Sequence, residues 1–344
     1  MTVPRPARLR TELAGALLRR VAGPDPAAAR DAIHRTPGPR WFAADSAIAR
    51  VHGDASMFVG GIRALLLQAL HPRAMAAVAA HSGYRSDPWG RLQRTATFLA
   101  ATTFGPVEQA EQYVAVVRAV HARISGVTPD GEPYRASDPH LLTWVHVAEV
   151  DSFLLAHQRF GRTPLDEAGC DEYVAQAARV ARALGGHDVP TTLAGLRSSL
   201  GAYRPELRGT AAARETADFL LREPPLPRTA RLGYSALAAA AVSLMPAWTR
   251  AELDLPWSPT TQSLGGIGGT LATKGIRWAL DAAEPGSPPE DDESSHGDEP
   301  HARDDRTADD RAADDRTADD RTADDRAADD DTPVPAPAAA PEAR

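Results

Sequence analysis

Helical patterning runs almost without interruption from about residue 40 to residue 283, and it constrains the fold more than any other feature. "SMFVGGIRALLLQAL" carries an apolar face at helical spacing, and Pro72 opens the next such segment, "HPRAMAAVAAH". Asp87 and Pro88 are the residue types that cap and begin a helix, and "PWGRLQRTATFLAATTF" follows them. No alternating strand pattern competes with these segments. The sequence therefore predicts an all-α fold.

Composition supports the same fold class. Aromatic residues make up only 6% of the chain and alanine is abundant, whereas strands are usually rich in aromatic and β-branched residues. We predict an N-terminal arm over residues 1–39 and a single multi-helix domain over residues 40–283, with one small hairpin at Asp130-Gly131. The glycine-rich segment "SLGGIGGTLA" (263–272) follows no strand, so we interpret it as a loop.

The last 61 residues, 284–344, contain the repeat Arg-Thr/Ala-Ala-Asp-Asp with a period of five. This period matches neither helix nor strand, and the repeat has no large apolar residue to bury. Such a segment cannot offset the entropy of becoming ordered, so we predict a disordered acidic tail.

Several classes of protein and location are disfavoured by the sequence. The single cysteine, Cys170, excludes an intramolecular disulfide framework. No signal peptide precedes the first arginines, so we expect a cytoplasmic protein. The apolar stretch 232–249 is weakly hydrophobic and contains Pro246, so we expect no transmembrane segment, although peripheral membrane contact remains open. No basic patch with interleaved aromatic residues indicates nucleic-acid binding.

One histidine has an unusual position. In "VRAVHARISG", His121 continues the apolar helical stripe formed by Val114, Val117 and Ile124. A neutral imidazole that projects from a helix into an apolar cavity is what a haem iron requires. An ordinary buried histidine would give the same pattern, so spacing alone leaves both interpretations open.

Two other metal sites are conceivable. His146 and Glu149 are three residues apart on one helix face with Asp151 nearby, which could form a non-haem site, although a di-iron bundle needs a second copy. Cys170 lies near a helix start and could be a thiolate haem ligand, although lone buried cysteines are usually plain core residues.

A second group of residues lies in "RLQRTATF". Arg91, Thr95 and Phe98 share one helical face, with Arg94 at its flank. A cation and a hydroxyl group above an aromatic ring would suit a distal haem pocket, where hydrogen-bond donors stabilise charge on bound dioxygen. An exposed arginine face above ordinary core residues is the alternative.

These segments, together with "PYRASDPHLLTWVHVAEVDSFLLAHQRFG", resemble the MpaB and latex-clearing-protein (rubber oxygenase) catalytic domain family over about residues 44–250. The resemblance implies an all-helical fold with a globin-like core that holds haem b. It also implies an oxygenase that cleaves carbon–carbon double bonds of isoprenoid chains with dioxygen.

The resemblance further implies roles for individual residues. His121 matches the proximal axial ligand of the iron, and Arg91 and Thr95 match a distal Arg-x-x-x-Thr pair. Arg94 stands where rubber oxygenases have a distal lysine, and His146 matches a second histidine of the haem pocket. Arginine cannot donate a lone pair to iron, so Arg94 cannot reproduce the lysine's role.

The expected function is therefore a haem b-dependent oxygenase acting with dioxygen on an apolar unsaturated substrate, such as a terpenoid or another lipid. The substrate pocket is expected around Phe58, Leu65 and Phe98. No Asp or Glu occurs between Ala55 and Ser86, where a distal catalytic carboxylate is expected. That absence favours the alternative, a non-catalytic haem- or lipid-binding helical protein.

Overall fold

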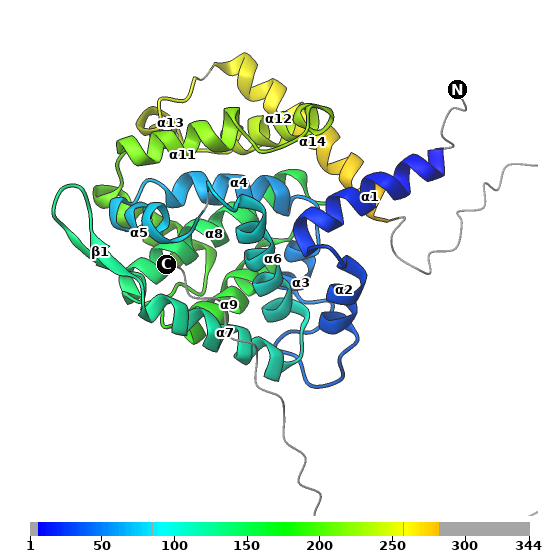
Figure 1. Ribbon diagram of the computed structural model, residues 1–344, viewed down its shortest axis with the longest axis horizontal. Coiled ribbons are helices and arrows are strands. Elements are labelled where there is room, and N and C mark those ends of the chain that lie inside the picture. Colours follow the sequence, from blue (N-terminus) through cyan, green and yellow to red (C-terminus); the bar gives the residue numbers. More distant parts are fainter. Residues whose placement is uncertain (1–5, 84, 257, 282–344) are drawn as a thin grey trace, which may run out of the picture. The chain divides into compact units, whose positions relative to one another are not determined.

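The computed structural model describes residues 6–83, 85–256 and 258–281. Within these residues the chain forms fourteen α-helices, one short 3-10 helix (η1) and two short strands, which confirms the all-α prediction (Figure 1). The elements are α1 (Pro6–Ala22), α2 (Pro26–His34), α3 (Ala47–His52), α4 (Met57–Gln68), α5 (Pro72–His81), α6 (Pro88–Phe104), α7 (Val107–Ala122), β1 (Ser125–Val127), β2 (Pro133–Arg135), α8 (Pro139–Phe160), α9 (Glu167–Leu184), α10 (Leu193–Tyr203), η1 (Arg204–Glu206), α11 (Ala211–Arg222), α12 (Arg228–Ser243), α13 (Ala247–Glu252) and α14 (Pro259–Leu280). The predicted acidic tail, 284–344, lies outside the described residues.

Local sequence signals set the ends of several helices. The Asp87 carboxylate accepts a hydrogen bond from the Gly90 amide at 2.9 Å, so α6 begins where the sequence predicts. The N-cap of α8 is Asp138, whose carboxylate accepts a hydrogen bond from the His140 amide at 2.9 Å. Helix α7 ends at Ala122, and Gly126 belongs to β1.

The predicted hairpin is present. β1 and β2 are antiparallel, with Gly126 opposite Tyr134. Gly131 has a φ of 89° in the turn between them, a conformation that glycine adopts without strain. A side chain at position 126 would overlap the Tyr134 ring, so glycine is also required there by its close neighbour.

The core is built around α4 and α8, which lie against one another and run in opposite directions. Gly60 of α4 lies against Phe153, and Gln68, at the other end of α4, donates a hydrogen bond to the carbonyl of Val145 at 3.5 Å. Fully buried large side chains such as Trp144 fill this interface and its surroundings. The register of these two helices fixes which residues of α8 face the middle of α4.

The interpretation of residues 263–272 as a loop is wrong, because they form part of α14. A side chain at Gly269 would come within 2.5 Å of the Ala240 Cβ atom, and one at Gly265 within 2.7 Å of the Ala239 carbonyl. The glycines thus allow α14 to approach the alanine-rich α12 closely, and this tertiary contact outweighs their low helix propensity. In Figure 1, α12 and α14 lie on the side of α4 away from α9.

The predicted N-terminal arm, residues 1–39, contains α1 and α2. Both helices contact α6, and α1 also contacts α14. Arg10 of α1 donates a hydrogen bond to the carbonyl of Trp278 and places its guanidinium group above the Trp278 ring. The described part of this segment therefore packs against the helices that follow.

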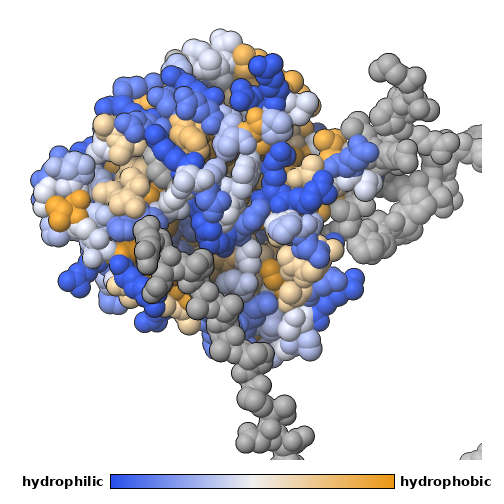
Figure 2. Space-filling view, in the orientation of Figure 1, coloured by the Kyte–Doolittle hydropathy of each residue, from blue (hydrophilic) through white to orange (hydrophobic). Residues whose placement is uncertain are grey.

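Exposed apolar side chains are scattered over most of the molecule. Figure 2 shows one face on which hydrophobic residues form small patches among hydrophilic ones. Helix α14 is an exception, because its exposed apolar residues follow helical spacing and form one stripe. Leu264, Ile267 and Leu271 are 61%, 60% and 66% exposed there. None of the described helices combines the length and the hydrophobicity needed to cross a lipid bilayer.

Candidate active site

The helices α6 and α7 carry two of the predicted site residues, Arg91 and His121. Only a short turn separates Phe104 from Val107, and the two helices contact each other.

The segments that carry His121 and His146 both approach the last turn of α9. Arg118, one helical turn before His121, donates a hydrogen bond to the carbonyl of Ala183 at 3.3 Å. His146 lies close enough to Arg182 for the guanidinium charge to lower the pKa of its imidazole. The two histidines are 25 positions apart in the sequence.

The His121 imidazole is half-buried, and its Nδ1 atom is buried without a hydrogen-bond partner among the described residues. Burial lowers the pKa of His121, so the ring is neutral at pH 7. A buried polar atom without a hydrogen-bond partner costs about 1–3 kcal/mol of folding free energy. The simplest explanation is that a bound ligand supplies the partner that the protein lacks. Its stripe is less buried than the sequence suggests, because only Val114 is fully covered while Val117 and Ile124 are half-exposed.

His146 is buried, and its Nε2 atom has no hydrogen-bond partner in the described part of the chain. Burial, assisted by the positive charge of Arg182, lowers the pKa of His146 to about 4. The side chain is therefore a neutral imidazole with an unused nitrogen inside the protein. This is a second unsatisfied group at the end of the α8/α9 pair.

Glu149 is a third such group, and nothing in its sequence context predicted a catalytic role. Burial raises the pKa of its carboxyl group to about 7, and no ion pair or hydrogen bond with a described residue compensates for the lost hydration. Its side chain is half-buried and keeps some accessible surface. Its spacing from His146 was visible in the sequence, but its lack of partners was not.

A hydrogen-bonded group borders the same region. The Nδ1 atom of His52 lies 2.8 Å from the Thr103 hydroxyl and its Nε2 atom lies 3.3 Å from the Tyr173 hydroxyl. Burial lowers the pKa of His52 to about 3, and the nearby carboxylate of Glu149 adds to the burial that raises the pKa of Tyr173. These residues come from α3, α6 and α9, and Tyr173 is the one close enough to Glu149 to be affected by its charge.

One face of α4 is left half-exposed. Phe58, Gly61, Leu65 and Gln68 follow helical spacing, all keep accessible surface, and a side chain added at Gly61 would meet no atom within 4 Å. The α4/α8 register places Glu149 level with the middle of this face. Helix α6 contacts α3 and helix α7 contacts α9, whereas neither is among the main neighbours of α4.

The predicted distal residues do not all face inward. Arg91 is half-buried and Phe98 is half-buried, but Thr95 is exposed and its hydroxyl donates to the Arg91 carbonyl at 3.1 Å. Arg94 is exposed and forms an ion pair with Asp87 at 3.2 Å. The structure therefore leaves Thr95 and Arg94 on the surface, whereas Arg91 and Phe98 are half-buried.

The two alternative metal sites gain no support. Asp151, the third member of the non-haem set, forms a 2.8 Å ion pair with Arg63 of α4 and is committed to that contact. Cys170 is buried, and burial together with the nearby carboxylate of Asp166 raises the pKa of its thiol. A thiolate ligand requires the opposite shift.

The residues beside α4 fit a haem in three respects. A neutral imidazole at His121 has an unused nitrogen, His146 offers a second one, and the uncovered face of α4 is mainly apolar. A flat apolar macrocycle with an electron-accepting iron would remove these unsatisfied groups from solvent and give the imidazole a partner.

The chain matches the family model described as "ER-bound oxygenase mpaB/B'/Rubber oxygenase, catalytic domain" over residues 49–278. This match covers more than half of the sequence, so the chain belongs to this family of oxygenases. No match was found among curated proteins or among solved structures.

Proposed function

We propose that the protein is a haem b-dependent oxygenase that acts with dioxygen on an apolar unsaturated substrate of the terpenoid or lipid class. One observation carries this proposal. Three titratable side chains, His121, His146 and Glu149, lie in or at the edge of the interior without a hydrogen bond to satisfy them, beside a helix face that is left open. The family supports the oxygenase class.

His121 is the residue that would hold the iron, because its imidazole is neutral and available. Arg118 and Arg123 lie on the same helix and could neutralise a haem propionate, whereas Arg73 and Arg85 already pair with Glu206 and Glu215. When bound, the haem would supply the redox-active iron required for chemistry with dioxygen.

The remaining residues bind and orient the cofactor and the reacting groups. Arg91, half-buried on α6, would donate hydrogen bonds where negative charge develops, and a rotation of Thr95 would release its hydroxyl for the same purpose. Arg94 contributes a surface charge and stays paired with Asp87. His146 would position the cofactor or its ligand through its free Nε2 atom.

Glu149 is the residue that would exchange protons. A pKa of about 7 means that its carboxyl group both holds and releases a proton near neutral pH, as general acid–base catalysis requires. It thereby takes the place of the distal carboxylate that is missing between residues 55 and 86. The apolar substrate would lie along Phe58, Gly61 and Leu65, where no side chain of the described part of the chain fills the space next to Gly61.

The exposed stripe of α14 formed by Leu264, Ile267 and Leu271 supports peripheral contact with a membrane, from which an apolar substrate would be taken.

The test is the visible absorption spectrum of the purified full chain, with haem quantified as the pyridine haemochrome, in the parent and in His121→Ala. We expect about one haem b per parent chain and its loss or an altered spectrum in the variant. The exposed His34 of α2 gives a matched control, since His34→Ala removes a histidine elsewhere and should leave the spectrum unchanged. A colourless parent that takes up no added haemin contradicts the proposal.

Catalysis is tested separately. Oxygen consumption and product formation are measured with an acyclic polyunsaturated isoprenoid and with its saturated analogue. Turnover of the unsaturated compound alone supports an oxygenase, whereas haem binding without turnover of any unsaturated lipid favours the non-catalytic binding protein.

A further inference from the structure

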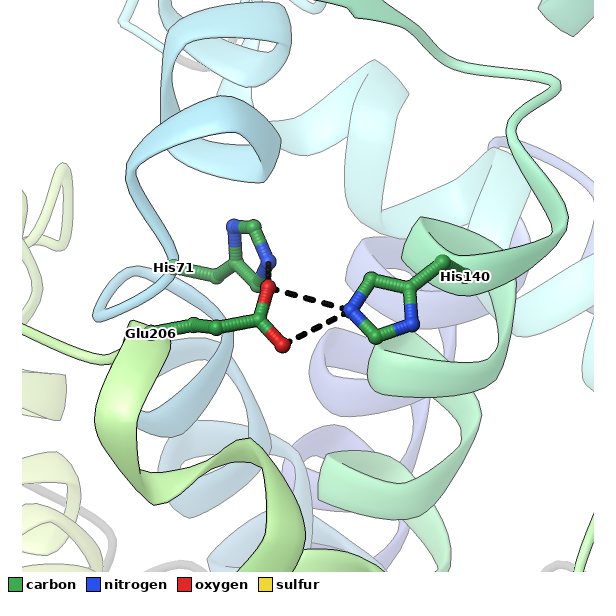
Figure 3. Close-up of side chains that lie close together, drawn as sticks. All are labelled: His71, His140 and Glu206. Atoms are coloured by element: carbon green, nitrogen blue, oxygen red, sulfur yellow. Dashed lines mark hydrogen bonds and ion pairs between the residues drawn. The ribbon is translucent and has the colours of Figure 1, made fainter.

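A second cluster of polar side chains lies at the start of α8, about two helical turns before His146. His71 precedes α5, His140 is in the first turn of α8, and Glu206 ends η1, so three segments distant in the sequence contribute one residue each. Figure 3 shows the three side chains pointing toward one another, with the carboxylate between the two imidazole rings. One ligand atom from each residue lies within 4.8 Å of the other two.

We propose that His71, His140 and Glu206 bind a divalent transition-metal ion, for which Zn²⁺ has the best match of ligands and geometry. This site is independent of the haem proposed above. Two imidazoles and one carboxylate are a frequent ligand set for Zn²⁺ with a fourth position open to water. The half-exposed side chains of His140 and Glu206 leave such a position on the solvent side.

The distances already approach those of a metal centre. The His140 Nε2 atom lies 2.8 Å from Oε1 and 3.0 Å from Oε2 of Glu206. The His71 Nε2 atom lies 3.3 Å from the same Oε2 atom. Ligand atoms bound tetrahedrally to Zn²⁺ at about 2.0–2.2 Å lie roughly 3.3–3.6 Å from one another. Small side-chain rotations would therefore place all three atoms around one ion.

The hydrogen bonds of His140 prepare it as a ligand. The Tyr203 hydroxyl donates its hydrogen to the backbone carbonyl of His140 at 2.9 Å and lies 3.4 Å from the Nδ1 atom of the same residue. Because that hydroxyl has already used its hydrogen, Nδ1 must be the donor in the second contact. The Nε2 atom then faces the Glu206 carboxylate, and either a proton or a metal ion between the two satisfies both of them.

His71 points to a ligand independently. Its side chain is 2% exposed, and neither ring nitrogen has a hydrogen-bond partner among the described residues, since the approach to Glu206 lacks hydrogen-bond geometry. The Trp144 ring packs 6.2 Å from the His71 ring and forms an apolar floor, so water does not solvate the imidazole from that side. A metal ion in the site would satisfy His71 and hold it in the neutral form.

The charged groups around the site are compatible with a divalent cation, but they do not select strongly for one metal ion over another. Arg73 lies 3.6 Å from the Glu206 carboxylate and offsets part of its charge. Asp138, which caps α8, and Asp188 contribute negative charge at Tyr203. The neutral imidazoles therefore favour an ion that prefers nitrogen ligands over Ca²⁺ or Mg²⁺, which prefer oxygen.

The proposal is tested on the full chain without an affinity tag, after treatment with a chelator. Zn²⁺ is titrated in competition with a chromogenic chelator, and Co²⁺ is used as a spectroscopic probe of tetrahedral coordination. We expect about one tight Zn²⁺ per chain, a Co²⁺ spectrum with nitrogen ligands, and a rise in Tm with Zn²⁺. Iron is counted separately as haem, so the two metals are not confused.

The variants distinguish this site from other histidines. His140→Ala and Glu206→Gln should weaken Zn²⁺ binding by more than about 100-fold, and Tyr203→Phe by about 10-fold, the scale of a lost outer-sphere hydrogen bond. His34→Ala and Glu215→Gln, both at exposed positions, should leave binding unchanged. Absence of stoichiometric Zn²⁺ in the parent overturns the proposal, as does binding that His140→Ala and Glu206→Gln retain in full.

Discussion

Arg63 of α4 and Asp151 of α8 form an ion pair of 2.8 Å in the interior, where the arginine side chain is only 2% exposed. Arg63 also donates to the Ser152 hydroxyl at 2.7 Å and to the Leu244 carbonyl at 3.1 Å. This one side chain therefore links α4, α8 and the end of α12. Asp151 lies two residues after Glu149 in "HVAEVD". The Asp151 carboxylate forms an ion pair, whereas the Glu149 carboxylate has no ion pair with a described residue.

Removing one partner of this pair should destabilise the protein strongly. Arg63→Leu leaves the Asp151 carboxylate buried without its partner, and the expected loss is about 3–5 kcal/mol of unfolding free energy. The measurement is urea denaturation followed by circular dichroism. The exposed pair Arg94–Asp87 gives the control, because Arg94→Leu should cost less than about 1 kcal/mol. Similar losses in the two variants would show that Arg63 is not a central contact.

The Glu149 carboxyl group should make stability depend on pH. Its pKa is about 7 in the folded protein and about 4.5 when unfolded, so the folded state holds the proton between these values. The contribution is fully present below pH 4.5 and is lost as pH rises through 7, by at most about 3 kcal/mol. Denaturation of the parent and of Glu149→Gln between pH 5 and pH 8 measures it. We expect the variant to lose less stability over this range, and parallel curves would contradict the raised pKa.

The same substitution should change catalysis. Because Glu149→Gln removes the acid–base group, oxygenase turnover should fall by about 100-fold or more while haem content stays at the parent level. The pH–rate profile of the parent should bend near pH 7, and that bend should be absent from the variant. Parent-like turnover with an unchanged profile would rule out proton transfer by Glu149.

Close contact between α12 and α14 depends on glycine. Gly269→Val would place a Cβ atom 2.5 Å from that of Ala240 and 2.9 Å from the Phe160 ring, so we expect a loss of about 1–3 kcal/mol or more. Gly275 lies in the same helix with nothing within 4 Å of an added Cβ atom, so Gly275→Ala should stabilise by about 0.5–1 kcal/mol. Thermal denaturation compares them, and equal effects of both substitutions would contradict the packing role of Gly269.

The exposed stripe of α14 should bind lipid surfaces. The triple variant Leu264→Gln, Ile267→Gln, Leu271→Gln should reduce co-flotation with phospholipid vesicles by about 10-fold or more, because apolar area no longer inserts between the lipids. Val127, 62% exposed on the hairpin, provides the control substitution Val127→Gln. A parent chain that never floats with vesicles would exclude this role for the stripe.

Much of the helical architecture follows from the sequence because it depends on neighbouring residues. Asp87 with Pro88 begins α6, Pro72 begins α5, and the turn at Gly131 forms the hairpin, each through local hydrogen bonds or backbone preferences. His121 and His146 were also identifiable, by helical spacing and by the resemblance to a family that the comparisons support. Their roles as cofactor residues stay predictions.

The tertiary structure determined features that the spacing of residues in the sequence does not encode. Residues 263–272 form a helix because α12 accepts their glycines at close range, although their composition is typical of a loop. Asp151 has a partner and Glu149 has none, yet the two are neighbours on one helix. His71, His140 and Glu206 come together only when three separate segments fold. Local preferences act over a few residues, whereas burial, desolvation and the meeting of distant side chains depend on how the whole chain packs.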